Sequence, residues 1–330
     1  ADLAILEQGI TIREGTVPDI GGWSVTAQGM RSYSLDLIAP FSLGDLNADG
    51  QLDVFGVTNA AEAPQMSGEV RAWSFIDGED GLPALQTADV LPLQSGPILD
   101  FKRCNNNIYA LIAGAENQTL HGVRISATDG TFELDDLFAA KEVSGDVLAC
   151  GRASAGSNGV AVGSYDGNWT VYNAMDGSEA GTGMGEPAYA IAMADTDGDG
   201  IDEVHGCEEL GCFILGADFN ADGIDEIVRS NNTNTTVHTD GGKQVFHTRG
   251  SLSTGDINND GHLDLMTFDA YTGTLSFHRG LNGTLAPGWS IRTERELEGP
   301  GFVGDVDAEG TLEFISMNAD GTLLHSRSSE

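Results

Sequence analysis

The sequence has little of what marks nucleic-acid-binding, membrane-spanning or helical proteins. Only 15 of its 330 residues are basic against 51 acidic ones, and the resulting formal charge of −36 repels nucleic-acid phosphates and anionic lipid headgroups. No run of eighteen apolar residues occurs, so we expect no membrane insertion. No segment has a sustained helical period with caps at both ends. These absences favour an all-β protein that binds neither nucleic acid nor membrane.

Motifs of common catalytic sites are also missing. HExxH, GxSxG and GxxxxGK[ST] do not occur, and the seven histidines form no ligand-like cluster. We therefore assign no catalytic residue. Trp23, Trp73, Trp169 and Trp289 are open to two interpretations, stacking on sugar rings or filling space between sheets.

Cysteine is scarce, and its spacing excludes a common zinc motif. The four cysteines contain no CxxC pair, which favours two disulfides in an oxidising compartment, outside the cell, in a periplasm or on a cell surface. The alternative is four buried free thiols in a cytosolic protein.

Glycine is abundant, with 45 residues against 9 prolines, which indicates many tight turns. One glycine is a fixed member of a nine-residue pattern that occurs five times: Asp, any residue, Asp or Asn, any residue, an acid, Gly, two further residues and an acid. The copies are DLNADGQLD (45–53), DTDGDGIDE (195–203), DFNADGIDE (218–226), DINNDGHLD (256–264) and DVDAEGTLE (305–313).

Strand-like runs flank each copy, and hairpin signals such as DG, GG and NG follow. Two further units at Asp100 and Asp146 resemble copies that have lost the glycine and the later acids. Most intervals between unit starts suit a four-stranded propeller blade of about 40 to 50 residues. We therefore predict a β-propeller and favour seven blades over six. The interval from 195 to 218 is only 23 residues, so either one blade has two strands or two motifs share an enlarged blade.

The ends of the chain predict how the ring closes. The last unit holds about three strands, and extended stretches within residues 1–38 have no unit of their own. We expect this N-terminal segment to complete the last blade of a single domain spanning 1–330.

The repeated loop has the donors of a calcium site. Calcium accepts six to eight oxygens at flexible angles, and side chains at positions 1, 3, 5 and 9 with a carbonyl at position 7 supply them. Isolated Asx turns are the alternative, but five copies in one register favour up to five calcium ions. The candidate ligands are Asp45, Asn47, Asp49, Gln51, Asp53; Asp195, Asp197, Asp199, Ile201, Glu203; Asp218, Asn220, Asp222, Ile224, Glu226; Asp256, Asn258, Asp260, His262, Asp264; and Asp305, Asp307, Glu309, Thr311, Glu313.

A DxNxDGxxD motif between strands, repeated at blade spacing over about residues 45–330, resembles the FG-GAP or VCBS repeats of integrin α-subunit-type β-propellers and of related secreted bacterial and fungal proteins. The resemblance implies a propeller whose calcium ions lie in inter-strand loops at one face. The chain departs from the pattern at Glu309, where an aspartate is usual, and at the glutamates in position 9 of three loops.

Within this frame, Cys104 and Cys150 each lie four residues after the opening aspartate of a degenerate unit. A disulfide between adjacent units would replace missing ions as a cross-link, and Cys207 would then pair locally with Cys212. Four cysteines permit three pairings, and sequence alone does not choose among them.

The resemblance, together with the lack of catalytic motifs, implies a secreted, calcium-stabilised binding module for a glycan or an extracellular protein. The alternatives are a polysaccharide-active propeller enzyme and a structural subunit of an extracellular assembly.

Overall fold

The computed structural model describes the strands of the chain and some of the loops between them. The described residues are 2–6, 9–13, 30–34, 42–44, 53–59, 67–77, 83–104, 107–114, 117–128, 131–154, 156–185, 187–209, 211–239, 242–255, 262–269, 271–272, 274–281, 284–286, 290–292, 302–304, 313–317 and 322–327. No helix in this part of the chain has the length and apolar character needed to cross a bilayer.

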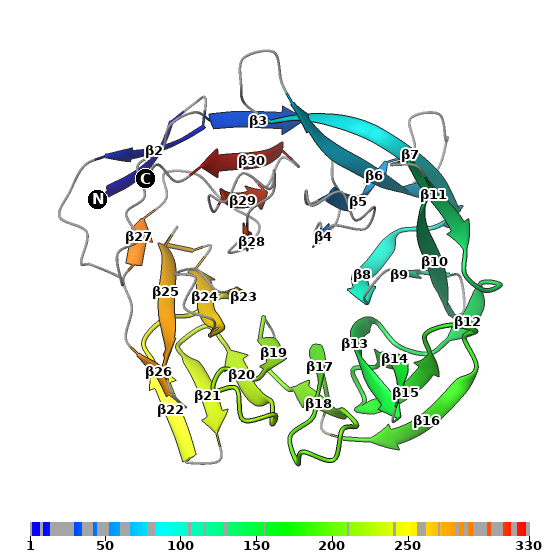
Figure 1. Cartoon of the computed structure of the whole chain (residues 1–330). Coiled ribbons are helices and arrows are strands. Elements are labelled where there is room, and N and C mark those ends of the chain that lie inside the picture. The colour runs from blue at the N-terminus through cyan, green and yellow to red at the C-terminus, as the bar shows by residue number, and fades with distance from the viewer. Residues whose placement is uncertain are drawn as a thin grey trace.

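The described strands form antiparallel sheets arranged in a ring, which is a β-propeller (Figure 1). The sheets up to residue 184 comprise β4 (Ser42–Gly44), β5 (Asp53–Asn59), β6 (Ser67–Asp77) and β7 (Pro83–Ser95); β8 (Ile98–Cys104), β9 (Asn107–Ile112), β10 (Gln118–Thr128), β11 (Thr131–Asp136) and β12 (Lys141–Val143); and β13 (Val147–Ser154), β14 (Ser157–Gly163), β15 (Asn168–Asn173) and β16 (Glu179–Met184).

The following sheets comprise β17 (Ala190–Ala194) and β18 (Glu203–Cys207); β19 (Phe213–Ala217), β20 (Glu226–Ser230), β21 (Thr235–Thr239) and β22 (Gly242–Phe246); β23 (Ser251–Gly255), β24 (Asp264–Asp269), β25 (Thr274–Leu281), β26 (Thr284–Ala286) and β27 (Ser290–Arg292); and β28 (Phe302–Gly304), β29 (Glu313–Met317), β30 (Thr322–Arg327) and β3 (Met30–Ser34). The remaining pair, β1 (Asp2–Leu6) and β2 (Gly9–Arg13), forms a hairpin. The first strand of each sheet in the ring lies nearest its centre (Figure 1).

The N-terminal part of the chain supplies the outer strand of the C-terminal sheet. Strand β3 pairs with β30, with Met30 opposite Ser326 and Ser34 opposite Thr322. This is the closure predicted for residues 1–38, and it covers an edge of β30 that would otherwise be open.

The core lies between neighbouring sheets, because alternate residues of a strand point to opposite faces. In β9, Ile108, Ala110 and Ile112 pack towards residues of β5 and β6. The intervening Tyr109 and Leu111 pack towards β13 and β14. The five side chains are at most 2% exposed, so each central strand contributes to two hydrophobic layers and joins its sheet to both neighbours.

The 23-residue interval corresponds to a short sheet. Strands β17 and β18 pair with each other and form a two-stranded sheet, whereas β19 opens a separate four-stranded one. The two motifs therefore belong to different sheets, as in the first of the two interpretations above.

The assignment of Asp100 and Asp146 as degenerate loop starts was wrong. Asp100 lies inside the inner strand β8, and Asp146 precedes β13, whereas Asp195 and Asp218 directly follow inner strands. Strand β8 ends at Cys104 and β9 begins at Asn107, so no nine-residue loop fits between the first and second strands of this sheet. Asp100 instead joins two sheets: its carboxylate accepts the N–H of Phe101 and that of Leu148, each at 2.7 Å.

Both predicted disulfides are present. Cys104 of β8 pairs with Cys150 of β13 at a Cα separation of 5.6 Å, and Cys207 pairs with Cys212 at 6.2 Å. The first links the inner strands of neighbouring sheets, and the second closes the end of β18 onto the start of the following sheet.

Removing the two disulfides separately should have unequal effects. In the chain-entropy model, opening a loop of 46 residues lowers the free energy of unfolding by about 4 kcal/mol, and opening one of 5 residues by about 2 kcal/mol. Urea unfolding of the Cys104→Ser/Cys150→Ser and Cys207→Ser/Cys212→Ser proteins measures both. A larger loss in the second protein would contradict unfolded-state entropy as the main term.

One buried histidine makes the fold sensitive to acid. His278 of β25 is 6% exposed, its ring lies 4.3 Å from that of Phe246, and its Nε2 is 3.2 Å from Thr248 Oγ1. Burial lowers the pKa of His278 from its usual 6.5 to about 4, because the imidazolium loses its hydration there.

Acidification should therefore destabilise the protein through His278. The unfolded chain takes up the proton near pH 6.5 and the folded chain only near pH 4, so stability is complete above the higher value and falls as the pH drops through this window. The loss at pH 4 is about 3 kcal/mol. Urea unfolding between pH 4 and pH 6.5 measures the free energy of unfolding, which should depend less steeply on pH in His278→Gln than in the unchanged protein. Parallel curves would show that His278 does not contribute.

Candidate metal centre

Two of the five predicted loops are described completely. Residues 195–203 connect β17 to β18, and residues 218–226 connect β19 to β20. Of the other loops, the structure places Asp53, His262, Asp264 and the backbone of Glu313. The remaining predicted ligands lie outside the described residues: Asp45, Asn47, Asp49, Gln51, Asp256, Asn258, Asp260, Asp305, Asp307, Glu309 and Thr311.

The aspartate at position 1 organises both complete loops in the same way. Asp195 Oδ1 accepts the N–H of Asp199 at 3.1 Å, and its Oδ2 accepts that of Gly200 at 2.9 Å. Asp218 accepts the corresponding N–H groups of Asp222 at 3.1 Å and Gly223 at 2.9 Å. One carboxylate thus folds the chain back over positions 5 and 6 in each loop.

The acid at position 9 ties the end of each loop to its start. Glu203 Oε2 accepts the N–H of Thr196 at 3.0 Å, and Glu226 Oε2 accepts that of Phe219 at 2.9 Å. Glycine at position 6 is needed for this closure, because Gly200 and Gly223 have φ angles of +86° and +90°, which side chains strongly disfavour.

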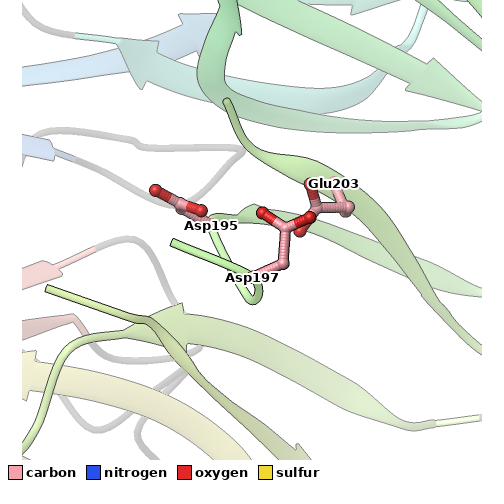
Figure 2. Close-up of side chains that lie close together, drawn as sticks. All are labelled: Asp195, Asp197 and Glu203. Atoms are coloured by element: carbon pink, nitrogen blue, oxygen red, sulfur yellow. The ribbon is translucent and has the colours of Figure 1, made fainter. Parts of the chain in front are cut away.

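The turn brings predicted ligands together. Single carboxylate oxygens of Asp195, Asp197 and Glu203 all lie within 4.8 Å of one another, and Figure 2 shows the three side chains gathered at this loop. Two oxygens that share a calcium ion at 2.3–2.6 Å are no more than about 5 Å apart, so this donor set fits such an ion. Asp199 Oδ1 accepts the N–H of Ile201 at 2.8 Å, and the ligand roles of both residues stay predictions.

The second loop gathers its polar groups through Asn220. The Asn220 amide donates to Asp222 Oδ2 at 2.9 Å and to Glu226 Oε1 at 2.8 Å. Burial, together with the nearby charges of Asp222 and Asp218, raises the pKa of Glu226 to about 7. A divalent cation at this position would reverse that electrostatic cost.

The first loop already has a cation beside it. Arg152 Nη2 of β13 lies 3.2 Å from Asp195 Oδ2, and its Nε lies 2.9 Å from Asp202 Oδ1. These carboxylates raise the pKa of Arg152 above its ordinary value. The loops thus share their turn geometry but differ in how their negative charge is balanced.

Two position-8 aspartates, which were not predicted to have a role, connect neighbouring sheets. Asp202 accepts the N–H of Arg152 at 2.8 Å and donates its own N–H to the Arg152 carbonyl at 2.9 Å. Asp225 makes the same reciprocal pair with Asp195, at 3.0 and 2.8 Å. We call these pairs the inter-sheet clamps. The other three loops have leucine at position 8, and that difference was the available sequence signal.

The clamps are on the two sides of the short sheet. The first attaches the β17–β18 sheet to β13, and the second attaches β19–β22 to the residue that follows β17. Hydrogen bonds thereby stabilise the position in the ring where fewer strands are present for packing.

The position-9 acids Asp53 and Asp264, which end two of the other predicted loops, are buried. Asp53 is 1% and Asp264 2% exposed. Asp264 Oδ1 accepts the N–H of Gly280 at 2.7 Å, which links β24 to β25. For Asp264, then, the structure shows a role within its own sheet, and its metal role stays a prediction.

Comparisons with known proteins support the fold without giving a family. No family model matches the chain, and no curated protein does. The solved structure of BBS1N in complex with ARL6DN is similar over 93% of this chain and 97% of that one, with a TM-score of 0.57 at 11% identity. A second structure of that complex gives 0.53 at 12% identity, covering 91% and 95%. BamB from Moraxella catarrhalis gives 0.46 at 13% identity, covering 92% and 100%. The likeness to BBS1N is one of fold, the β-propeller.

Truncating one clamp should destabilise the ring. Asp225→Ala leaves the N–H of Asp195, a residue only 2% exposed, without its acceptor, and the free energy of unfolding should fall by about 1–3 kcal/mol. Asp225→Asn keeps an acceptor oxygen and should lose less. Urea unfolding in the presence of a chelator measures both; equal losses would mean that the hydrogen bond is not the source of stability.

Proposed function

We propose that this chain is a calcium-stabilised β-propeller of the FG-GAP or VCBS type that acts as a binding module. The observation that carries the proposal is the repeated loop: two copies have the same hydrogen bonds, and in one of them three carboxylates converge within 4.8 Å. A binding role agrees with the lack of common catalytic motifs in the sequence.

The ring in this proposal has seven blades, with β17–β18 as the truncated one. Up to five calcium ions occupy the loops between first and second strands. The two disulfides are compatible with an oxidising compartment, so the protein functions outside the cell, in a periplasm or on a cell surface. Its ligand is an extracellular protein or a glycan. The propeller of BBS1N is found in complex with ARL6DN, which supports a protein ligand.

Calcium removal should lower the melting temperature. An ion that binds only the folded state stabilises it by about 2.7 kcal/mol when its concentration is one hundred times its Kd. Calcium added after chelation should restore the original melting temperature. Elemental analysis should find calcium in the purified protein. A melting temperature that chelation leaves unchanged would contradict the proposal that calcium stabilises the fold.

A matched pair of variants locates one site. Asp197→Asn removes a predicted ligand, and Asp135→Asn makes the same charge change at an exposed residue of β11. Only Asp197→Asn should lower the number of bound calcium ions. If both variants keep the full number, residues 195–203 do not hold an ion.

The binding role is tested separately on glycan arrays and against immobilised candidate proteins, with the same samples assayed for polysaccharide cleavage. Saturable binding without turnover supports a binding module. Bond cleavage would contradict it and favour a propeller enzyme.

A further inference from the structure

The short sheet leaves a strand edge with no strand beside it. Among the described residues β18 pairs with β17 alone, whereas the neighbouring sheets continue outward through third and fourth strands (Figure 1). A cavity of about 480 Å³ adjoins the end of β18 at Gly206 and Cys207, and β20–β22 form its opposite wall. In a four-stranded sheet, the third strand would run along this edge.

The wall opposite β18 is cationic. Arg229, His238 and Lys243 all line the cavity. The ladder places Thr236 opposite Arg229 and Lys243 opposite His238, so Arg229, Lys243 and the imidazole of His238 lie on one face of the sheet. Burial and the charges of Arg229 and Lys243 lower the pKa of His238.

These cations lack acidic partners in a strongly acidic protein. Within the described part of the chain, neither Arg229 nor Lys243 forms an ion pair, although the sequence has 51 acidic residues against 15 basic ones. Glu208 and Glu209 line the cavity near the Cys207–Cys212 disulfide. The cations are therefore available for an external anionic group.

The sheet on the other side of β17–β18 has room in the corresponding position. Gly181 and Gly183 of β16 pair with Val171 and Trp169 of β15, and these two residues pack towards the short sheet. A Cβ atom on Gly181 would meet no other atom within 4 Å. At Gly183 the ring of Trp169 already fills the corresponding space, so backbone from another chain can approach β16 closely only at Gly181.

We propose that β18 accepts an extended, acidic segment of a partner protein, which adds as the third strand of the short sheet and places carboxylates against Arg229 and Lys243. This proposal rests on the proposed binding function and names the class of partner. The edge of β18 supplies backbone hydrogen bonds that a glycan lacks the regular amides to match. The cations supply the preference for acidic side chains.

The preference for an acidic segment comes from the local charges of Arg229 and Lys243 and not from the net charge of the protein. The net charge of −36 repels an acidic peptide at long range, but at physiological salt this field is screened beyond about 8 Å. Unspecific attraction therefore cannot account for binding of an acidic peptide, which makes such a peptide a stringent probe.

The test uses a fluorescein-labelled peptide of alternating threonine and glutamate, about ten residues long to span a strand, and fluorescence anisotropy with the full chain at about 0.15 M salt. We expect saturable binding that Arg229→Glu and Lys243→Glu each weaken by about tenfold or more. Arg124→Glu makes the same charge change as Arg229→Glu at an exposed position of β10 and should leave binding unchanged.

A second peptide tests strand addition. N-methylation of alternate residues removes amide donors and keeps every carboxylate, so this peptide should bind at least about tenfold more weakly. Hydrogen exchange of the β18 amides should slow only with the unmodified peptide.

Three outcomes would overturn the proposal: no binding of the unmodified peptide, equal weakening by the Arg124 and Arg229 substitutions, or equal binding of the methylated peptide. Binding of a sulfated oligosaccharide in place of the peptide would assign the cavity to a glycan. The calcium-dependent melt of every variant is measured in parallel. If calcium still raises the melting temperature while peptide binding fails, only the assignment of the β18 edge and its cavity as the peptide site is wrong. If the melting temperature does not respond to calcium, the proposed function itself fails.

Discussion

The carboxylate that opens each nine-residue loop is the contact on which the described loop geometry depends. Asp195 and Asp218 accept hydrogen bonds from the backbone N–H groups at positions 5 and 6 of their own loops. These bonds hold the glycine at position 6 in its left-handed conformation, and in the first loop the turn brings the carboxylates of Asp195, Asp197 and Glu203 together. In the second loop, burial and, after it, the nearby charges of Asp222 and Asp218 raise the pKa of Glu226, so that carboxylate is costly to ionise. A hard dication in these loops would offset this cost, and the oxygens available to bind it include those that form the turn. Turn formation and ion binding would therefore make the same demand on the sequence, and the recurrence of the pattern in one register agrees with this.

The ring is stabilised differently at its full and its short sheets. Where a sheet has several strands, alternate residues such as Ile108 and Tyr109 fill two separate hydrophobic layers. The two-stranded sheet of β17 and β18 offers less apolar surface. Hydrogen bonds and a covalent link stabilise it in addition, namely the inter-sheet clamps of Asp202 and Asp225 and the Cys207–Cys212 disulfide. The same shortening that requires these contacts also uncovers β18 and the cationic face next to it. A local loss of packing thus coincides with a surface suited to binding.

Much of this arrangement follows from periodicity, and what does not follow depends on tertiary context. Loop spacing predicted the propeller and the short unit, and the unassigned strands within residues 1–38 predicted the pairing of β3 with β30. Spacing failed at Asp100, because an aspartate inside a strand cannot be distinguished by type from one that follows it; its true role needs Leu148, 48 residues away. The roles of Asp202 and Asp225 were missed because they depend on backbone groups of a neighbouring sheet and, for Asp202, also on the Arg152 side chain 50 residues away. Arg229, His238 and Lys243 gather only when the sheet is formed, and their exposure depends on strands that a neighbouring sheet lacks.

The pairing of β3 with β30 also has a mechanical consequence. Met30 lies opposite Ser326 in an antiparallel ladder, so the N-terminal side of β3 and the C-terminal side of β30 leave the sheet at the same end. Tension applied between residues 30 and 327 would open the ladder one hydrogen bond after another, as in a zipper, instead of shearing all of its bonds together. The rupture force of the ring would then be set by the few residue pairs of this ladder.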